Sequence, residues 1–351
     1  MTQSIPSKED LLTFTKQAMV KVGVPEVDAN VVASTLVDAD LRGIHSHGVS
    51  RLPIYVERIK RGLISPVAKM RILNSAGATI IIDGGSSLGP VIAKYAMEKC
   101  IEVARDQGVG VCTVMHANHV GMLGHFSEMA TYQKMMGIVV CNAAPSMAPW
   151  GGMTPALGSN PMAISIPSGE DWPITLDIST SASARGKIRL AALKGTTIPY
   201  GWAVDSEGQP TQDPNKALKG SLLPFGEHKG YGLAVIMEIL AGILSGANFG
   251  ADLGSMYEMS KVSGIGIYMQ TVDISHFMRL DDFTARISKY AQMLKSVPKR
   301  PGFTQIYMPG EPERAISRKR AIEGIPLDDE TLKQLQHLAE SLEIGLPTHS
   351  A

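Results

Sequence analysis

The chain has 351 residues, a length that predicts about two domains, and its 33 basic and 33 acidic side chains give a net charge of zero. A balanced chain lacks the basic surface of a nucleic-acid-binding protein, so a nucleic acid is not an expected partner. Hydrophobic residues make up 44% of the chain and charged residues 19%, which supplies a large buried core and excludes intrinsic disorder.

Three cysteines, Cys100, Cys112 and Cys141, are too few and too scattered for a disulfide framework or a cysteine-based zinc site. The opening segment, Met1–Asp10, has no apolar stretch, which predicts that no signal peptide is present. We therefore expect a cytoplasmic protein with free thiols.

The first 65 residues predict three helices. Ser7 is a candidate N-cap of the first, which Gly23 and Pro25 end, and the other two cover about 28–41 and 52–61. From about residue 72 the pattern changes to short strands bounded by turn residues. The expected strands are 79–83, 108–115, 137–141, 162–166, 174–178 and 264–270, and the expected helices are 91–107, 120–136, 231–244, 281–295 and 328–342. This order predicts an α/β core between two helical ends.

Two connecting segments, 142–161 and 180–224, are unusually long. Both are rich in glycine, proline, serine and asparagine, but they carry apolar anchors such as Trp150, Leu157 and Trp202. Long ordered loops in a compact domain are usually functional. We expect these two segments to form loops around a site.

The apolar segment 230–250 is nearly long enough to cross a membrane. Glu238 lies near its middle, and a central carboxylate costs roughly 2.5–3.5 kcal/mol on membrane insertion. We therefore expect a buried core helix and no contact with a membrane. Its small residues, Ala241, Gly242, Ser245 and Gly246, would let another helix or a subunit approach closely.

Five of the nine histidines fall in two glycine-rich stretches: His45 and His47, then His116, His119 and His125. Imidazoles can bind a metal, but no carboxylate with suitable spacing completes a ligand set. A second interpretation is that the histidines are hydrogen-bonded parts of the core. Two clusters together favour acid–base catalysis, because a proton shuttle at neutral pH needs a pKa near 7.

Arg51 follows His47 by four residues, at the predicted start of the third helix. A guanidinium group at a helix N-terminus suits a substrate carboxylate, which it can hold through two parallel hydrogen bonds. The alternative is an ordinary solvated arginine on the surface.

No Gly-x-Gly-x-x-Gly sequence follows a strand and no Walker A motif is present, so a Rossmann-type nucleotide site is not predicted. The segment Pro224–Gly232 instead combines glycines, Lys229 and the start of a helix, which are the features of a cradle for a pyrophosphate. Gly230 and Gly232 have a second interpretation, because glycines also permit tight packing.

Together these motifs resemble the malate/L-lactate dehydrogenase family, which is unrelated to the Rossmann-type lactate dehydrogenases. The family includes ureidoglycolate dehydrogenase, sulfolactate dehydrogenase, diketogulonate reductase and piperideine-carboxylate reductase. The resemblance spans almost the whole chain. It is carried by Ala39–Arg51, Asn118–Gly121, Pro149–Gly152, Gly158–Pro161, Leu176–Ile178, Lys229–Gly232 and Met308–Glu311.

The resemblance implies a nicotinamide-dependent interconversion of a 2-hydroxy acid and its 2-oxo acid, of the malate, lactate or sulfolactate type, with NAD or NADP and a slight preference for NAD. It implies a helical domain made of residues 1–72 and 305–351, and a central α/β cofactor-binding domain, 73–304, without a Rossmann motif. It also implies a homodimer or a larger assembly. Ureidoglycolate oxidation and cyclic imino-acid reduction are alternative activities on the same scaffold. A catalytically silent binding protein is the alternative of another class.

By position, the resemblance makes His119 and His47 the catalytic residues. His119 would handle the proton of the substrate oxygen and His47 would polarise or orient that oxygen, with the reverse assignment as the alternative. Arg51 would hold the substrate carboxylate, with Ser46 and Tyr55 beside it. The cofactor would lie along Asn142, Ala143, Ser159, Asn160, Leu176, Asp177, Ile178, Ser179, His228, Lys229, Gly310 and Glu311. No residue is assigned to a metal.

Overall fold

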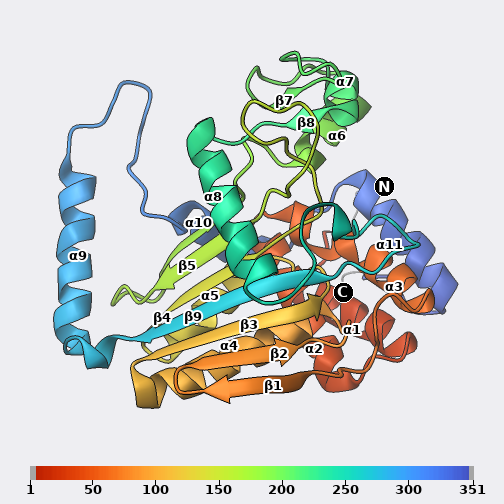
Figure 1. The fold of residues 1–351 in the computed structure, drawn as a ribbon. Coiled ribbons are helices and arrows are strands. Elements are labelled where there is room, and N and C mark those ends of the chain that lie inside the picture. Colours follow the sequence, from red (N-terminus) through yellow and green to blue (C-terminus); the bar gives the residue numbers. More distant parts are fainter. Residues whose placement is uncertain (1–4, 348–351) are drawn as a thin grey trace.

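A seven-stranded mixed sheet runs through the centre of the computed structural model, which describes residues 5–347 (Figure 1). Its order is β1-β2-β3-β9-β4-β5-β6, and every neighbouring pair is antiparallel except β2 and β3. The strands are β1 (Arg71–Ala76), β2 (Thr79–Asp83), β3 (Val109–Ala117), β4 (Met135–Cys141), β5 (Met162–Ile166), β6 (Ile174–Ile178) and β9 (Ile265–Asp273). The predicted α/β class is confirmed, and β1 is a strand that the sequence pattern did not single out.

Helices α4 (Gly89–Gln107) and α5 (Leu123–Tyr132) cover one face of this sheet (Figure 1). Their apolar sides and the strands beneath them form one core, in which the thiols of Cys100 and Cys112 are buried and free. The helix expected at 120–136 is shorter than predicted. It ends at Tyr132 because Lys134 has a left-handed backbone (φ 65°) and Met135 already begins β4.

Helices from both ends of the chain share a second core. It joins α1 (Lys8–Lys21), α2 (Glu26–Leu41) and α3 (Leu52–Lys60) to α11 (Asp329–Leu342). The expected N-cap is confirmed: the Ser7 hydroxyl accepts from the main chain of Asp10, and the Asp10 carboxylate accepts from the main chain of Ser7, which together form a capping box. Helix α10 (Glu311–Glu323) completes this part of the molecule and contacts α2.

Residues 180–224, expected as a loop, form a small lobe with regular structure of its own (Figure 1). It contains α6 (Arg185–Lys194), β7 (Ala203–Val204), α7 (Pro214–Lys219) and β8 (Ser221–Leu222). A separate apolar core, which includes Ile188 and Leu222 with Met147 and Leu157 from the loop 142–161, holds the lobe together and attaches it to the next helix through Ala234. These elements are too short to show a clear hydrophobic period.

That next helix, α8 (His228–Glu238), continues as a π-helical turn, Ile239–Ile243, and crosses the other face of the sheet. The expectation of a fully buried helix is wrong. One side packs on β4, β5 and β9 through Met237 and Ala241, whereas Leu233, Ile236, Ile239, Ile243 and Leu244 are exposed. Within residues 5–347, no helix combines the length and the apolar composition that crossing a membrane requires.

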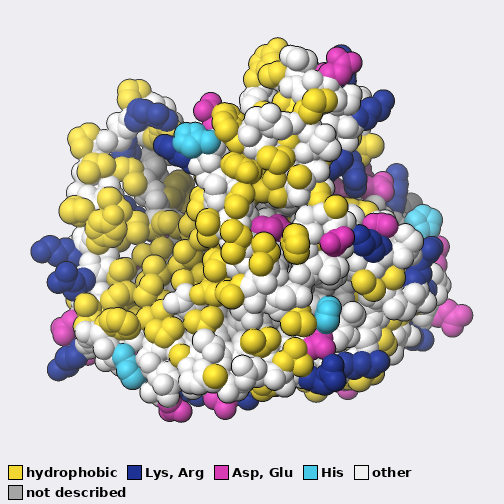
Figure 2. Space-filling model, in the orientation of Figure 1, with side chains coloured by type: hydrophobic (Ala, Val, Ile, Leu, Met, Phe, Trp, Pro, Cys, Tyr) yellow, Lys and Arg dark blue, Asp and Glu magenta, His cyan; other side chains and the backbone are white. Residues whose placement is uncertain are grey.

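Helix α9 (Leu280–Ser296) stands at the edge of the molecule, and none of its residues is buried. Figure 2 shows hydrophobic side chains gathered in the hollow between α9 and α8.

Candidate active site

A buried carboxylate holds the turn that carries the first two histidines. Asp40, 1% exposed at the end of α2, accepts a hydrogen bond from the main chain of Val49 (2.7 Å) and pairs with Nδ1 of His45 (2.7 Å). Arg320 donates to Nε2 of His45 (2.9 Å), so Nδ1 is the nitrogen that donates to Asp40. A Cβ at Gly48 would lie 2.1 Å from the Asp40 carboxylate, so only glycine fits there. Both ring nitrogens of His45 are thus used within the protein.

The turn points the next histidine toward His119, which follows β3. The rings of His47 and His119 stack with their centres 5.6 Å apart. Ser46 Oγ lies 2.9 Å from Nδ1 of His47, and the Tyr55 hydroxyl lies 2.7 Å from Nδ1 of His119. Two imidazoles, distant along the chain, therefore form one pair, and a hydroxyl orients each of them.

Arg51 lies beside this pair. Its Nε donates to the main-chain oxygen of Ser46 (2.5 Å), and its Nη1 donates to the hydroxyl of Tyr257 (2.6 Å). The catalytic and substrate-binding candidates His47, His119, Ser46, Tyr55 and Arg51 thus form a single cluster. Tyr257 is an additional member of it.

Burial and positive charge keep both histidines neutral. Burial, with the charge of Arg51, lowers the pKa of His47 to about 4. Burial lowers the pKa of His119 well below its usual value, and His47 and Arg51 act in the same direction. Burial raises the pKa of Tyr55, so its hydroxyl keeps its proton. The cluster offers neutral imidazoles that can take up a proton, next to a fixed positive charge.

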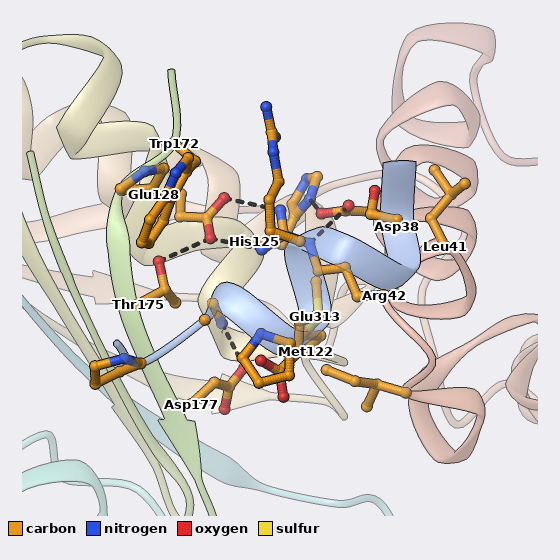
Figure 3. Close-up of a pocket in the computed structure, with 18 of the residues that line it drawn as sticks. Asp38, Leu41, Arg42, Met122, His125, Glu128, Trp172, Thr175, Asp177 and Glu313 are labelled. Carbon is orange, nitrogen blue, oxygen red and sulfur yellow. Dashed lines mark hydrogen bonds and ion pairs between the residues drawn. The ribbon is translucent and has the colours of Figure 1, made fainter. Parts of the chain in front are cut away.

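A cavity of about 870 Å³ is lined in part by Met122 and Gly124, which follow His119 in the chain (Figure 3). Its walls include four of the residues that were expected to bind a cofactor: Leu176, Asp177, Ile178 and Gly310. The volume is in the range of small-molecule sites in proteins.

Charged side chains from α2 and α5 form one part of the cavity wall (Figure 3). Arg42 donates to both oxygens of Glu128 (2.5 and 2.8 Å) and to Asp38 (2.9 Å). His125 pairs with Asp38 (2.8 Å), and Thr175 donates to Glu128 (2.8 Å). The charge of Arg42 is therefore already balanced by two carboxylates.

Asp177, at the end of β6, accepts a hydrogen bond from the main chain of Gly124 at the start of α5 (2.7 Å). Burial raises the pKa of Asp177 to about 6, although this hydrogen bond and the charge of Arg42 act in the opposite direction. Glu313 also lines the cavity, and its charge raises the same pKa. The cavity therefore holds four carboxyl groups: Asp38, Glu128, Asp177 and Glu313.

The side chains of Asn142 and Asn160 are fully buried around Glu238, the carboxylate of α8. Asn160 donates to Glu238 (2.6 Å) and to the main chain of Ala234 (2.9 Å), and it accepts from Ala143 (3.0 Å). Asn142 donates to Glu238 (3.3 Å) and accepts from the main chain of Gly266 (2.8 Å). These amide groups join α8 to β4, β5 and β9.

The remaining cofactor candidates lie in three places. Thr180, the first residue of the lobe, donates to the main-chain oxygen of Ser159 (2.8 Å), which brings Ser159 close to Ser179. His228 and Lys229 are exposed at the start of α8. Glu311 pairs with Lys295 of α9 and accepts from the main chain of Met308 (2.9 Å).

Gly230 serves tight packing. A Cβ there would lie 2.2 Å from the Phe225 carbonyl oxygen, and the main-chain N–H groups of Lys229 and Gly230 already donate to carbonyl oxygens of the same turn. Among residues 5–347, no group of three or more His, Cys, Asp or Glu side chains is placed to hold a metal ion.

Two groups in the site were not indicated by the sequence pattern. Tyr257 lies in an irregular loop, so no period marks it. Arg42 and Asp38 follow an ordinary charge pattern on a helix, and their contact with Glu128 appears only when α2 and α5 pack together.

Comparison with known proteins agrees with this architecture. The family model for malate/L-lactate dehydrogenase matches residues 7–336. L-sulfolactate dehydrogenase of Methanothermobacter thermautotrophicus is 40% identical over 340 residues, which are 97% of this chain and 98% of the relative. Ureidoglycolate dehydrogenase (NAD(+)) of Escherichia coli is 33% identical over 330 residues, 94% of either chain.

The crystal structure of malate dehydrogenase from Entamoeba histolytica superimposes with a TM-score of 0.94 and 33% identity, covering 99% of this chain and 100% of that one. The family model and these relatives confirm the prediction of a dehydrogenase. The chain therefore belongs to the malate/L-lactate dehydrogenase family.

Proposed function

We propose that this protein interconverts a 2-hydroxy acid and its 2-oxo acid with a nicotinamide cofactor, at the cluster of His47, His119 and Arg51. The single observation that carries the proposal is this cluster: two neutral imidazoles stacked 5.6 Å apart beside a guanidinium group. The relatives named above act on sulfolactate, ureidoglycolate and malate, which supports the reaction class.

His119 is the proposed proton-transfer residue. A neutral imidazole can take the hydroxyl proton of the acid during oxidation and return it during reduction. The Tyr55 hydroxyl can either donate to Nδ1 of His119 or accept from it, so it supports both tautomers through the reaction. His47, on the other side of the stack, orients the same substrate oxygen.

Arg51 is the proposed partner of the substrate carboxylate. Its Nε and Nη1 already bond Ser46 and Tyr257, which fixes the direction of the guanidinium plane. A carboxylate held in that plane through two hydrogen bonds places the neighbouring C2 atom beside the histidines, and positioning of this kind supplies much of the catalysis in hydride transfer.

The cofactor is proposed to occupy the cavity beyond His119, held by Leu176, Asp177, Ile178 and Gly310. Ser159, Ser179, His228 and Lys229 are the proposed contacts outside the cavity. When bound, the nicotinamide supplies or accepts the hydride. Two observations support this placement: the volume of the cavity is in the range of small-molecule sites, and Met122 in its wall follows His119 by three residues.

NAD is the proposed form of the cofactor. The cavity contains four carboxyl groups, and its most buried cation, Arg42, is already paired with two of them. The additional phosphate of NADP would meet these negative charges, and the other lysine and arginine side chains in the wall are the exposed Lys8 and Arg314, which already pairs with Asp171. The relative from Escherichia coli is named as an NAD(+) enzyme.

The experiment that tests the function follows nicotinamide absorbance with a panel of 2-oxo acids, with NADH and NADPH in turn. Replacing His119 with Ala should lower turnover by about 100-fold or more, because the proposed base for the hydroxyl proton is removed. Binding of NADH, measured by fluorescence titration, should stay within about threefold, since His119 touches the acid.

Arg51→Lys is the companion variant. It keeps the charge but loses the planar pair of donors, so KM for the acid should rise while cofactor affinity stays the same. Unchanged turnover in His119→Ala, or an unchanged KM in Arg51→Lys, would remove that residue from the mechanism.

We also propose that two copies pair through an open apolar surface, formed by the exposed side of α8 with its π-helical turn and by α9. Helix α9 carries apolar residues at helical spacing, Leu280, Phe283, Ile287, Tyr290 and Leu294, yet none of its residues is buried. A helix of this length gains its stability mainly from packing, so a partner is expected to cover it. A second copy offers the same apolar surface in return.

A further inference from the structure

Two arginines meet at one aromatic ring next to the histidine pair. The guanidinium carbon of Arg51 lies 5.8 Å from the centre of the Tyr257 ring, and that of Arg189 lies 5.1 Å from the same point. The two positive charges are thus separated by no more than the sum of these distances. Arg51 comes from the helical part of the molecule and Arg189 from α6 of the lobe.

Neither arginine has an acidic partner in the part of the chain that the structure describes. Most other arginines near the site are neutralised or used within the fold: Arg42 pairs with Asp38 and Glu128, and Arg58 and Arg320 donate to carbonyl oxygens. Two uncompensated cations beside a reaction site favour a ligand with two negative groups.

The three elements that meet here are held firmly. Arg58 of α3 is 1% exposed and donates to the carbonyl oxygens of Glu258 (2.7 Å) and Lys261 (3.0 Å), which anchors the loop that carries Tyr257. Ile188, the neighbour of Arg189, is fully buried in the core of the lobe, so α6 has a fixed orientation. The convergence of Arg51, Tyr257 and Arg189 is therefore part of the folded structure.

We propose that Arg189 binds a second acid group of the substrate, at the end remote from the carboxylate held by Arg51, so that the enzyme prefers a 2-hydroxy or 2-oxo acid with two negative charges. This inference rests on the proposed function and adds its substrate class. A short dianion would lie with one end at each guanidinium group and its C2 atom at the histidines. An acid with an uncharged tail would leave Arg189 without a partner.

The test compares two 2-oxo acids with the same number of carbon atoms, oxaloacetate and 2-oxobutyrate, which differ in the charge of the remote group. In Arg189→Gln, kcat/KM for oxaloacetate should fall by about 10- to 100-fold, mainly through KM, because a charge-assisted hydrogen bond is lost. The value for 2-oxobutyrate should change by less than about fivefold. Arg189→Lys should restore part of the preference, since the charge returns.

Lys194→Gln is the matched control, because it removes one positive charge from the same helix at an exposed position that forms no ion pair with the described residues. It should leave both acids unaffected. A third acid, 3-sulfopyruvate, distinguishes a remote sulfonate from a remote carboxylate. Whichever of the two is preferred, its advantage over 2-oxobutyrate should disappear in Arg189→Gln.

Two results would overturn the inference while leaving the proposed function in place: equal use of charged and uncharged acids by the unsubstituted enzyme, or equal losses for both acids in Arg189→Gln. If the unsubstituted enzyme reduces none of the acids with either cofactor, the proposed function fails and this inference fails with it.

Discussion

At the scale of single residues, the electrostatics of the site depend on Arg51. Its charge adds to burial in lowering the pKa of both His47 and His119. A substrate carboxylate bound to Arg51 would offset that charge, so the pKa of each histidine should rise when the acid binds. Binding of the acid is thereby linked to binding of a proton.

This linkage predicts proton uptake on binding of malate to the cofactor-free enzyme. At about pH 5.5, between the lowered pKa of His47, about 4, and the ordinary histidine value near 6.5, the free protein holds His47 neutral and the complex should hold part of a proton. Calorimetry in buffers with different ionisation enthalpies measures the number of protons. Uptake should decrease in His47→Asn, and proton release would contradict the assignment of Arg51 to the carboxylate.

The sequence predicted one consequence of Glu238 but not its contacts. Its charge argued against a membrane span, and no spanning helix is found among the described residues. The structure adds its role: three donors, the side-chain amides of Asn142 and Asn160 and the main chain of Gly250, surround this carboxylate. These donors supply the hydrogen bonds that a buried carboxylate needs.

At the scale of secondary-structure elements, the loop 253–263 depends on one arginine from α3. The guanidinium group of Arg58 donates to the main chain of Ser255, Met256, Glu258 and Lys261 and to Ser263 Oγ. Irregular backbone has few partners of its own, so a buried side chain with five donors can organise it. The loop in turn presents Tyr257 to Arg51.

Replacing Arg58 with Met should therefore loosen the loop. We expect faster amide hydrogen exchange in 253–263, a loss of about 2–4 kcal/mol in the free energy of unfolding, and a higher KM for the acid. The control is Arg61→Met at the C-cap of the same helix, where an exposed ion pair with Glu57 should contribute less than about 1 kcal/mol. Equal exchange rates in both variants would mean that Arg58 does not hold the loop.

The helical segment that crosses the sheet shows that a local hydrophobic pattern does not determine burial. The segment 231–244 is apolar on all sides, which predicts burial, yet in the single chain only one side is covered. Its small residues allow close packing, as expected. A Cβ at Gly242 would lie 2.6 Å from the Asn142 amide. The main chain at Ala241 comes so near to β9 that a Cβ at Gly266 of that strand would lie 1.8 Å from the Ala241 carbonyl oxygen.

At the scale of the whole molecule, the open apolar surface is the feature that a single copy leaves uncovered. Stable interfaces bury roughly 800 Å² on each partner, over about 20–30 residues. The exposed side of α8, the hollow beside it and α9 form a continuous apolar region on one face (Figure 2). A dimer would cover that region and would also support α9.

Ile236→Glu should shift the protein to a monomer in sedimentation experiments, because a buried, unpaired carboxylate is costly at an apolar interface. Val27→Glu, at a residue of α2 that is 75% exposed, is the matched control and should leave the assembly unchanged. An unsubstituted protein that sediments as a monomer would contradict the proposed interface.

The domain boundaries at 72 and 304 remain a proposal, and the two main cores support it. One core gathers the first three helices with α11, and the other gathers the sheet with α4 and α5. The lobe with α6 has a third core, which the sequence pattern did not indicate. Each core includes a residue close in the chain to one member of the proposed site: Val49 near His47, Val120 next to His119, and Ile188 next to Arg189.

The sequence alone determined the elements with a clear hydrophobic period and their order. Strands 79–83, 162–166 and 174–178 were predicted with the observed bounds, and so was the N-cap at Ser7. Such features depend on neighbours a few residues away. Motifs in chain order were also sufficient to indicate the family.

Only the tertiary structure decided which side chains meet. Arg51 and Tyr257 are 206 residues apart, Arg42 and Glu128 are 86 apart, and no local pattern relates the members of either pair. The exposure of α8 and the short elements of the lobe could not be predicted from the sequence either. The physical reason is that a period reports which side of an element is apolar, whereas contacts and burial depend on what packs against that side.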